Sequence, residues 1–177
     1  ELRVHENSST KIAIVDGNVM TNSKTTCGGV NARVYMDGHW GFASSSAISD
    51  DDIRKVIAEA RSNAEFLKNK VPNKSFEELK VSGYSFEKSF ATTKPRKSQK
   101  ELIDFGKMVY NHVKDTYTGL LSISVNIICD DTEKQILTSS KAYYYTLTPR
   151  SNVLVTLVID RDGAPIQLSQ YFRGLGQ

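Results

Sequence analysis

Residues 28–44 read GGVNARVYMDGHWGFAS and carry the clearest fold signal in the chain. The residues at every second position from Val30 to Met36 are apolar, and polar Asn31 and Arg33 lie between them. This alternation is typical of a strand with one buried face. Asp37-Gly38 follows directly, and an Asp-Gly pair accommodates the positive φ angles of a two-residue hairpin turn. The stretch therefore predicts two antiparallel strands joined by a tight turn.

The residues before this hairpin continue the same pattern. Ile12 and Ile14 share one face of a preceding strand, and Asp16-Gly17 supplies a second hairpin turn. Residues 2–42 therefore predict a meander of antiparallel strands.

A helix is predicted after the meander. Apolar residues recur at steps of three and four from Ile53 to Leu67 and form one stripe. Ser49 can cap the free amides, and the aspartates at 50–52 complement the positive end of the helix dipole. Lys68 and Lys70 suit the opposite end, so the helix is expected to reach about residue 70.

The middle of the chain loses this periodicity. Residues 71–97 gain Ser, Lys and Pro, which indicates a long loop or linker. Ser98 and Glu101 have the spacing of a capping box and begin a second amphipathic helix that reaches about Thr116. We expect a first α+β domain over 1–70, a basic linker over 71–97 and a second α+β segment over 98–177.

The second segment is predicted to be rich in strands. Apolar residues alternate from Leu121 to Cys129, and Asp130-Asp131 is expected to turn the chain into a run that ends near Leu137. Ala142 to Leu147 is expected to form a further strand.

A last hairpin is predicted near the end of the chain. Val153 to Ile159 should pair with Ile166 to Phe172 across Asp162-Gly163. The order of strands, helix, linker, helix and strands predicts an α+β fold with antiparallel sheets rather than an alternating βαβ series.

The composition excludes several classes of protein. The chain has 177 residues, of which 39% are hydrophobic and 24% charged, so neither a disordered tail nor a fibrous repeat fits. The longest apolar run, Val153 to Ile159, is far shorter than the roughly 20 residues that cross a bilayer, and no membrane association is expected. Cys27 and Cys129 lack CxxC spacing and are expected to be buried free thiols in a reducing, cytoplasmic compartment.

The basic character of the chain is concentrated in its middle. The net charge is +3, and eight lysines and arginines lie between Lys70 and Lys100. Their positions do not follow one helical face, and no aromatic RNA-binding motif accompanies them. The sequence therefore disfavours nucleic acid as a partner.

No complete active site stands out. His5-Glu6 has the beginning of a zincin motif, but Ser9 and Thr10 occupy the positions where the second histidine would stand. His39 could contact a ligand, although a solvated histidine in a turn is the favoured interpretation. His112 is expected on the second helix with no functional role. We predict no catalytic residue, metal ligand or cofactor site in this chain.

Three motifs resemble the N-terminal domain of the TldD/PmbA family. They are Asp16-Gly17-Asn18, the strand Gly28 to Tyr35, and the turn Asp37 to Ser44. In that family a strand ending in D-G precedes a strand of G-V-x-x-R-V type, a D-G-x-W-G-F-A-S turn and an amphipathic helix. These features occur here in the same order. The motifs cover residues 1 to about 70, and the remainder is similar only in pattern.

The resemblance implies a parent protein that is a zinc metallopeptidase, also described as a modulator of DNA gyrase. It implies a zinc ion on an HExxxH helix and a later cysteine, both downstream of this region. The chain is then the non-catalytic part that walls in or binds an extended peptide or unfolded protein, in a homodimer or a heterodimer with a related subunit. The alternative is a stand-alone peptide- or protein-binding scaffold without enzymatic activity.

The candidate contact residues lie in the aromatic turn. His39, Trp40, Gly41 and Phe42 are expected to touch substrate or a neighbouring domain. The favoured interpretation for Trp40 and Phe42, however, is that they fill a core beneath the first helix, because aromatic side chains dominate core burial.

Overall fold

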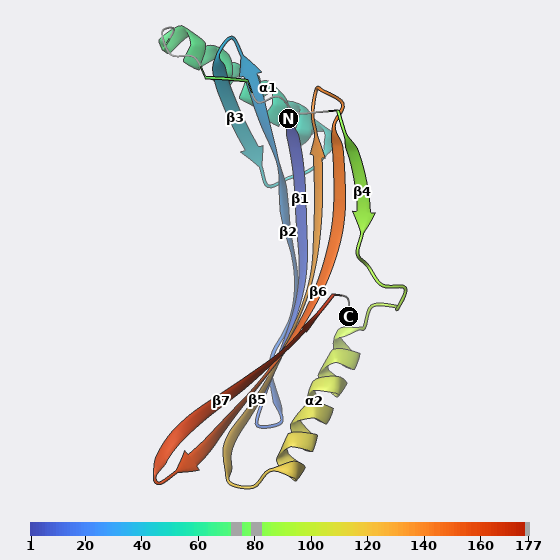
Figure 1. The fold of residues 1–177 in the computed structure, drawn as a ribbon, viewed down its shortest axis with the longest axis vertical. Helices are drawn as coiled ribbons and strands as arrows, with labels where there is room; N and C mark the ends of the chain where they lie inside the picture. Colours follow the sequence, from blue (N-terminus) through green and yellow to red (C-terminus); the bar gives the residue numbers. More distant parts are fainter. Residues whose placement is uncertain (72–75, 79–82, 176–177) are drawn as a thin grey trace. The chain divides into compact units, whose positions relative to one another are not determined.

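The structure is a computed structural model that describes residues 1–71, 76–78 and 83–175. Its elements, shown in Figure 1, are β1 (Leu2–Val15), β2 (Asn18–Met36), β3 (His39–Ser45), α1 (Asp50–Lys70), β4 (Ser85–Ser89), α2 (Gln99–Thr116), β5 (Leu120–Leu137), β6 (Tyr143–Arg161) and β7 (Ala164–Gly174). The strands follow the order β3-β2-β1-β5-β6-β4, and β7 also pairs with β6. The predicted α+β fold class is confirmed.

The elements belong to two compact units that are interleaved along the chain. Unit 1 comprises Glu1–Asn7, Thr26–Ser89 and Thr132–Leu147, and unit 2 comprises Ser8–Thr25, Phe90–Asp131 and Thr148–Gln177. Four strands, β1, β2, β5 and β6, are long enough to contribute one part to each unit. The expected division into 1–70, 71–97 and 98–177 stays a prediction.

The hairpin turns are where the sequence predicts them. In each of the pairs 16–17, 37–38 and 162–163, both the aspartate and the glycine have positive φ angles, between 46° and 85°. This is the backbone of a type I′ turn, whose twist matches that of the strands it joins. The register of the last hairpin pairs Val153 with Phe172 and Ile159 with Ile166, which confirms the predicted partners.

Unit 1 contains a small core between α1 and the sheet. Ser49 caps α1 through a capping box with Asp52, and the predicted first helix is confirmed. The stripe that α1 turns inward consists of Val56, Ala60 and Ala64. The buried cluster of this unit is made of Val30, Ala32, Ala43, Val56 and Ala60.

Unit 2 contains a second core between α2 and the sheet. Its buried cluster is made of Ile12, Ile14, Leu102, Val125, Ile127 and Cys129. Burial raises the pKa of the Cys129 thiol, which favours its neutral form. Cys129 is therefore a buried free thiol, as expected, whereas Cys27 is free but exposed, and its predicted burial is wrong.

Three local predictions are wrong in detail. β5 passes through Asp130-Asp131 without a turn, and β6 joins the two separate strands expected at 142–147 and 153–159. Strand neighbours on both sides satisfy the backbone of β5 and β6, so the weak turn signal of two aspartates without glycine is overridden. In the predicted loop, Ser85–Ser89 forms β4, which pairs parallel with β6 rather than antiparallel.

None of the helices in the described residues is long and apolar enough to cross a membrane.

The start of α2 predicts an acid-sensitive contribution to stability. The backbone amide of Ser98, then Lys97 and the Ser98 hydroxyl, hold the pKa of Glu101 at about 2, below its ordinary value of 4.5. A lowered folded-state pKa stabilises the fold above pH 4.5, and this contribution is lost as the pH falls through about 2. Glu101→Gln should therefore reduce the dependence of the thermal midpoint on pH across this window. An unchanged dependence, measured by circular dichroism, would contradict the capping-box role.

Candidate functional site

In unit 1, the pairing of β2 with β3 places the side chains of the aromatic turn, residues 37–44, alternately on the two faces of the sheet. Arg33 pairs with Phe42 and Tyr35 with Trp40, and directly paired residues project from the same face of a sheet. Alternate residues therefore project toward α1, and these are His39, Gly41 and Ala43, all buried. The four predicted site residues are thus divided, with His39 and Gly41 on the α1 side and Trp40 and Phe42 on the other.

Gly41 is the point where α1 comes closest to β3. A Cβ atom at this position would lie 1.9 Å from the carbonyl oxygen of Ala60 and 2.3 Å from the amide nitrogen of Ala64. Both are backbone atoms of a helix, which cannot swing aside as a side chain can. Gly41 is required here so that the helix can lie directly on the strand.

His39 is buried, with 4% of its surface exposed, so the interpretation as a solvated turn histidine is wrong. Its Nδ1 lies 3.0 Å from the carbonyl oxygen of Asp37, and its Nε2 lies 2.9 Å from that of Val71. An imidazole ring carries at least one N–H donor, so His39 donates a hydrogen bond to at least one of these two carbonyl groups. Because Val71 caps the C-terminal end of α1, His39 ties the helix end to the hairpin turn.

Replacing this histidine should destabilise unit 1. His39→Leu introduces an apolar side chain of similar volume and leaves the carbonyl groups of Asp37 and Val71 without the imidazole. The expected cost is on the order of 1–3 kcal/mol of unfolding free energy, because two part-buried carbonyl acceptors lose the imidazole. Urea denaturation measures this loss. His5→Leu is the matched control, since His5 is exposed in the same unit; equal losses in the two variants would contradict the role of His39.

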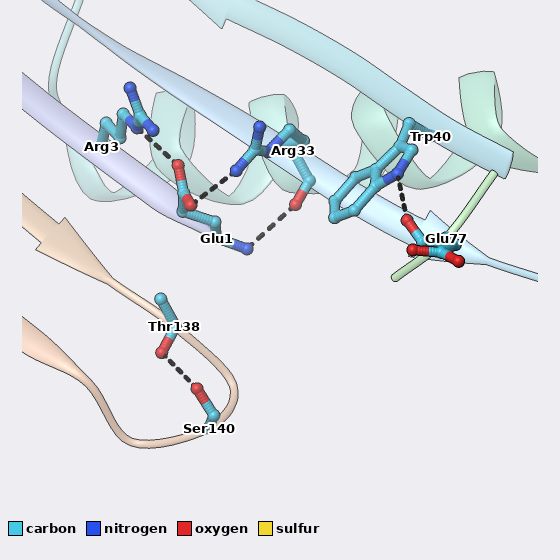
Figure 2. Close-up of polar contacts among 7 residues, drawn as sticks. All are labelled: Glu1, Arg3, Arg33, Trp40, Glu77, Thr138 and Ser140. Carbon is cyan, nitrogen blue, oxygen red and sulfur yellow. Dashed lines mark hydrogen bonds and ion pairs between the residues drawn. The ribbon is translucent and has the colours of Figure 1, made fainter. Parts of the chain in front are cut away.

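The opposite face carries a small aromatic and basic platform made by Tyr35, Trp40 and Arg33, of which Figure 2 draws Trp40 and Arg33. The rings of Tyr35 and Trp40 lie with centroids 5.0 Å apart, and the guanidinium of Arg33 lies 4.8 Å from the centre of the Trp40 ring. Arg33 is held in turn by the Glu1 carboxylate at 2.8 Å, which also bonds Arg3. Burial by itself would raise the pKa of Glu1, but the two arginines outweigh it and keep that pKa below its ordinary value.

Trp40 and Phe42 do not fill a core beneath α1. Trp40 is half-buried on the platform, and 58% of the Phe42 surface is exposed. Burial of an aromatic ring removes a large apolar area from water, so an exposed phenylalanine beside a half-exposed tryptophan leaves apolar surface for a partner. Whether the predicted residues contact a substrate or a domain stays a prediction.

A short segment from elsewhere in the chain lies against this platform. The Phe76 amide donates a hydrogen bond of 2.7 Å to the Gly38 carbonyl. The Tyr35 hydroxyl donates to the Phe76 carbonyl at 2.9 Å, and the Trp40 indole donates to the Glu77 carbonyl at 3.4 Å. Figure 2 shows the last of these contacts. The platform therefore holds the main chain of two consecutive residues.

A hollow of about 390 Å³ opens beside this contact. It is lined by His39, Trp40, Leu67, Val71 and Phe76. The Phe76 ring lines this hollow without being enclosed, because 60% of its surface is exposed. An apolar hollow next to two side-chain donors and a main-chain acceptor is suited to one apolar side chain of an extended peptide.

An exposed ion pair borders the turn. Lys68 lies 2.6 Å from the Asp37 carboxylate, and hydrogen bonding and charge attraction lower the pKa of Asp37 and raise that of Lys68. Pairs exposed to solvent in this way add little to stability. In the described parts of the chain, no three or more His, Cys, Asp or Glu side chains gather in a way that could hold a metal ion.

Unit 2 has a hollow of its own, of about 610 Å³, beside α2. It is lined mainly by apolar groups of Leu102, Phe105, Met108, Ile127 and Val153, together with Cys129. Lys97, Glu101, Asp104 and Ser151 also line it. The platform is the better-defined candidate, because there two side-chain donors, Tyr35 and Trp40, converge on the main chain of one segment.

Tyr35, Gly38 and the segment at Phe76 were not predicted from the sequence as residues of a binding site. A signal for Tyr35 did exist, because a two-residue turn at 37–38 places residue 35 opposite Trp40. No such signal exists for Phe76, whose contacts join residues about forty positions apart in a stretch without periodicity.

Comparisons with known proteins agree with this architecture. Three solved structures resemble the chain: a proposed modulator of a DNA gyrase from Thermotoga maritima, at 16% identity and a TM-score of 0.79; a proposed modulator of DNA gyrase from Bacteroides thetaiotaomicron, at 14% and 0.71; and TldE from Thermococcus kodakarensis, at 13% and 0.63. The chain is covered over 97%, 99% and 97% of its length, and it spans only 38%, 40% and 39% of theirs. At these identities the likeness is one of fold.

The sequence comparisons give the family. No curated protein matches the sequence. Residues 1–64 match the family profile described as PmbA/TldA metallopeptidase domain 1, which is the region that carries the D-G and G-V-x-x-R-V motifs. The resemblance to the TldD/PmbA family is thereby confirmed, and the chain carries the first domain of the PmbA/TldA metallopeptidase family in residues 1–64.

Proposed function

We propose that this chain is the non-catalytic, substrate-side part of a TldD/PmbA-like zinc metallopeptidase. The observation that carries the proposal is the match of residues 1–64 to the first domain of that metallopeptidase family. The chain also spans only about two fifths of the length of the solved proteins it resembles, which supports a larger parent.

The part that this chain plays is to bind an extended peptide or an unfolded protein segment. Strand β3 ends the strand order, so one of its edges has no neighbouring strand in the described residues. An exposed edge offers backbone hydrogen bonds that recognise any extended chain, whatever its side chains. Main-chain recognition of this kind suits a peptidase with broad sequence preference.

The hydrolytic chemistry belongs to the rest of the parent protein. A zinc ion on the HExxxH helix and the later cysteine would activate water, with the glutamate of the motif as the base. The residues of this chain would position the peptide and would not touch the metal. The proposal includes a cytoplasmic location and a dimer of identical or related subunits.

The test compares the native gene product with the 177-residue chain. The native product should be much heavier than 19.7 kDa, contain zinc and cleave unfolded peptides, whereas the chain alone should bind peptides without cleaving them. A metal-free native product of 19.7 kDa that binds peptides would contradict the peptidase and favour the stand-alone scaffold.

A further inference from the structure

The contact between the platform and residues Phe76 and Glu77 has the features of an occupied binding site. One acceptor and two donors of the sheet meet one amide and two carbonyl groups of the segment. All three contacts are made to the main chain of the segment, and none depends on its side chains. An unrelated extended peptide could therefore make the same three contacts.

The segment is held lightly. Phe76, Glu77 and Glu78 are exposed, and the ring of Phe76 is not part of the buried cluster of unit 1. The segment thus loses little apolar burial when it leaves. Three hydrogen bonds near the surface, each worth about 0.5–1.5 kcal/mol net, are a modest barrier to its exchange.

We propose that the platform of Tyr35 and Trp40, together with the Gly38 carbonyl of the hairpin turn, is a peptide-binding site, and that the chain's own Phe76-Glu77 segment occupies it as an internal ligand that an incoming peptide displaces. The favoured peptide is extended, with an aromatic residue at the position of Phe76, where the hollow lies, followed by an acidic residue. The inference rests on the peptide-binding half of the proposed function and is independent of the zinc site.

The positive charge of the platform agrees with this preference. Arg33 lies on β2 and contacts the Trp40 ring directly, and Arg3 on β1 shares the Glu1 carboxylate with it. Glu77 is the residue whose carbonyl the indole binds. An acidic residue at this place in a peptide is attracted by the guanidinium groups, so we expect affinity to fall as salt rises.

An internal ligand lowers the apparent affinity for an external one. A tethered segment competes at an effective concentration on the order of millimolar. The apparent affinity falls by the fraction of molecules in which the site is open. Disabling the segment without altering the site should therefore tighten peptide binding.

Three substitutions separate the segment from the site. Phe76→Pro removes the amide hydrogen that Gly38 accepts and leaves the platform untouched. Phe76→Ala retains this hydrogen and removes the ring, so it isolates the side chain. Tyr35→Phe removes the hydroxyl donor of the site while preserving the ring beside Trp40.

The experiment follows the fluorescence of Trp40, which is the only tryptophan of the chain. The probe is a capped, dye-labelled peptide Gly-Phe-Glu-Glu-Gly, whose binding is followed in parallel by dye anisotropy. The unlabelled peptide should shift the Trp40 emission. Phe76→Pro should bind about five- to tenfold more tightly than the wild type, and Tyr35→Phe should lose most of that gain when combined with it. Far-ultraviolet circular dichroism checks that each variant is folded.

The outcomes distinguish the inference from the proposed function. Binding seen by anisotropy without any change of Trp40 emission, or equal affinities for the wild type and Phe76→Pro, would overturn the inference and leave the proposed function standing. Absence of binding to every folded variant would overturn both. A zinc-free native product together with tight binding by Phe76→Pro would overturn only the peptidase.

Discussion

Gly41→Ala should lower the free energy of unfolding of unit 1 by about 3 kcal/mol or more. The added methyl group would lie 1.9 Å from the Ala60 carbonyl oxygen and 2.3 Å from the Ala64 amide nitrogen. Neither atom can move without shifting the whole of α1, because both belong to the hydrogen-bonded backbone of the helix. Relief of the clash must separate α1 from β3 and open the core around Val56.

Urea denaturation followed by Trp40 fluorescence measures this loss, since the tryptophan lies next to the substitution. Gly174→Ala is the control, because nothing lies within 4 Å of a Cβ atom at that position. Phe42→Ala is a second control, since the ring of the neighbouring residue is 58% exposed. A Gly41→Ala protein as stable as these controls would show that the helix does not lie directly on the strand.

Phe42→Ala and Gly41→Ala together also separate structure from function in the aromatic turn. If Phe42 contacts a peptide or a neighbouring domain, Phe42→Ala should weaken binding while leaving stability within about 0.5 kcal/mol. Gly41 is a packing residue, and its replacement should reduce binding only to the extent that unit 1 unfolds. The four residues of the turn therefore do not act as one site.

Local signals predicted the parts of the fold that local chemistry determines. Each Asp-Gly pair forms its turn because few other dipeptides tolerate two successive positive φ angles. Ser49 and Ser98 cap their helices because the serine and the acidic residue three positions later satisfy each other's backbone groups. These features need no knowledge of distant parts of the chain.

The remaining features depend on contacts between distant residues. The sequence predicted a turn at Asp130 and Asp131 because pairs of aspartates are common in turns. In the structure both residues lie within the continuous strand β5, and Arg96 forms an ion pair of 2.7 Å with Asp131. The sequence predicted a solvated His39 because the residue whose carbonyl group binds its ring, Val71, lies thirty-two positions later in the chain. The Phe76 contact has the same origin, and alternation of side chains cannot reveal it.

Ile14→Ala should cost unit 2 about 2–5 kcal/mol of unfolding free energy. The Ile14 side chain is fully buried, with 0% of its surface exposed, between α2 and its neighbours in the core. Removing three carbon atoms leaves a cavity that the surrounding strands cannot close completely, because their backbones are fixed by pairing. Met20→Ala is the control, since Met20 is 68% exposed and should change stability by no more than about 0.5 kcal/mol.

A substitution at Gly106 on α2 tests whether the cavity left by Ile14→Ala lies directly beneath this glycine. A Cβ atom at Gly106 would lie 2.6 Å from Ile14 Cδ1, so Gly106→Ala alone should destabilise the protein despite the better helix propensity of alanine. In the Ile14→Ala background that carbon is gone, and the nearest remaining atom is Ile127 Cδ1, at 3.2 Å. The same methyl group then fills part of the cavity, and Gly106→Ala should restore about 1 kcal/mol or more. This reversal of sign, measured as a double-mutant cycle by urea denaturation, should give a coupling of about 0.5–3 kcal/mol. Additive effects of the two substitutions would mean that α2 does not cover Ile14 at Gly106.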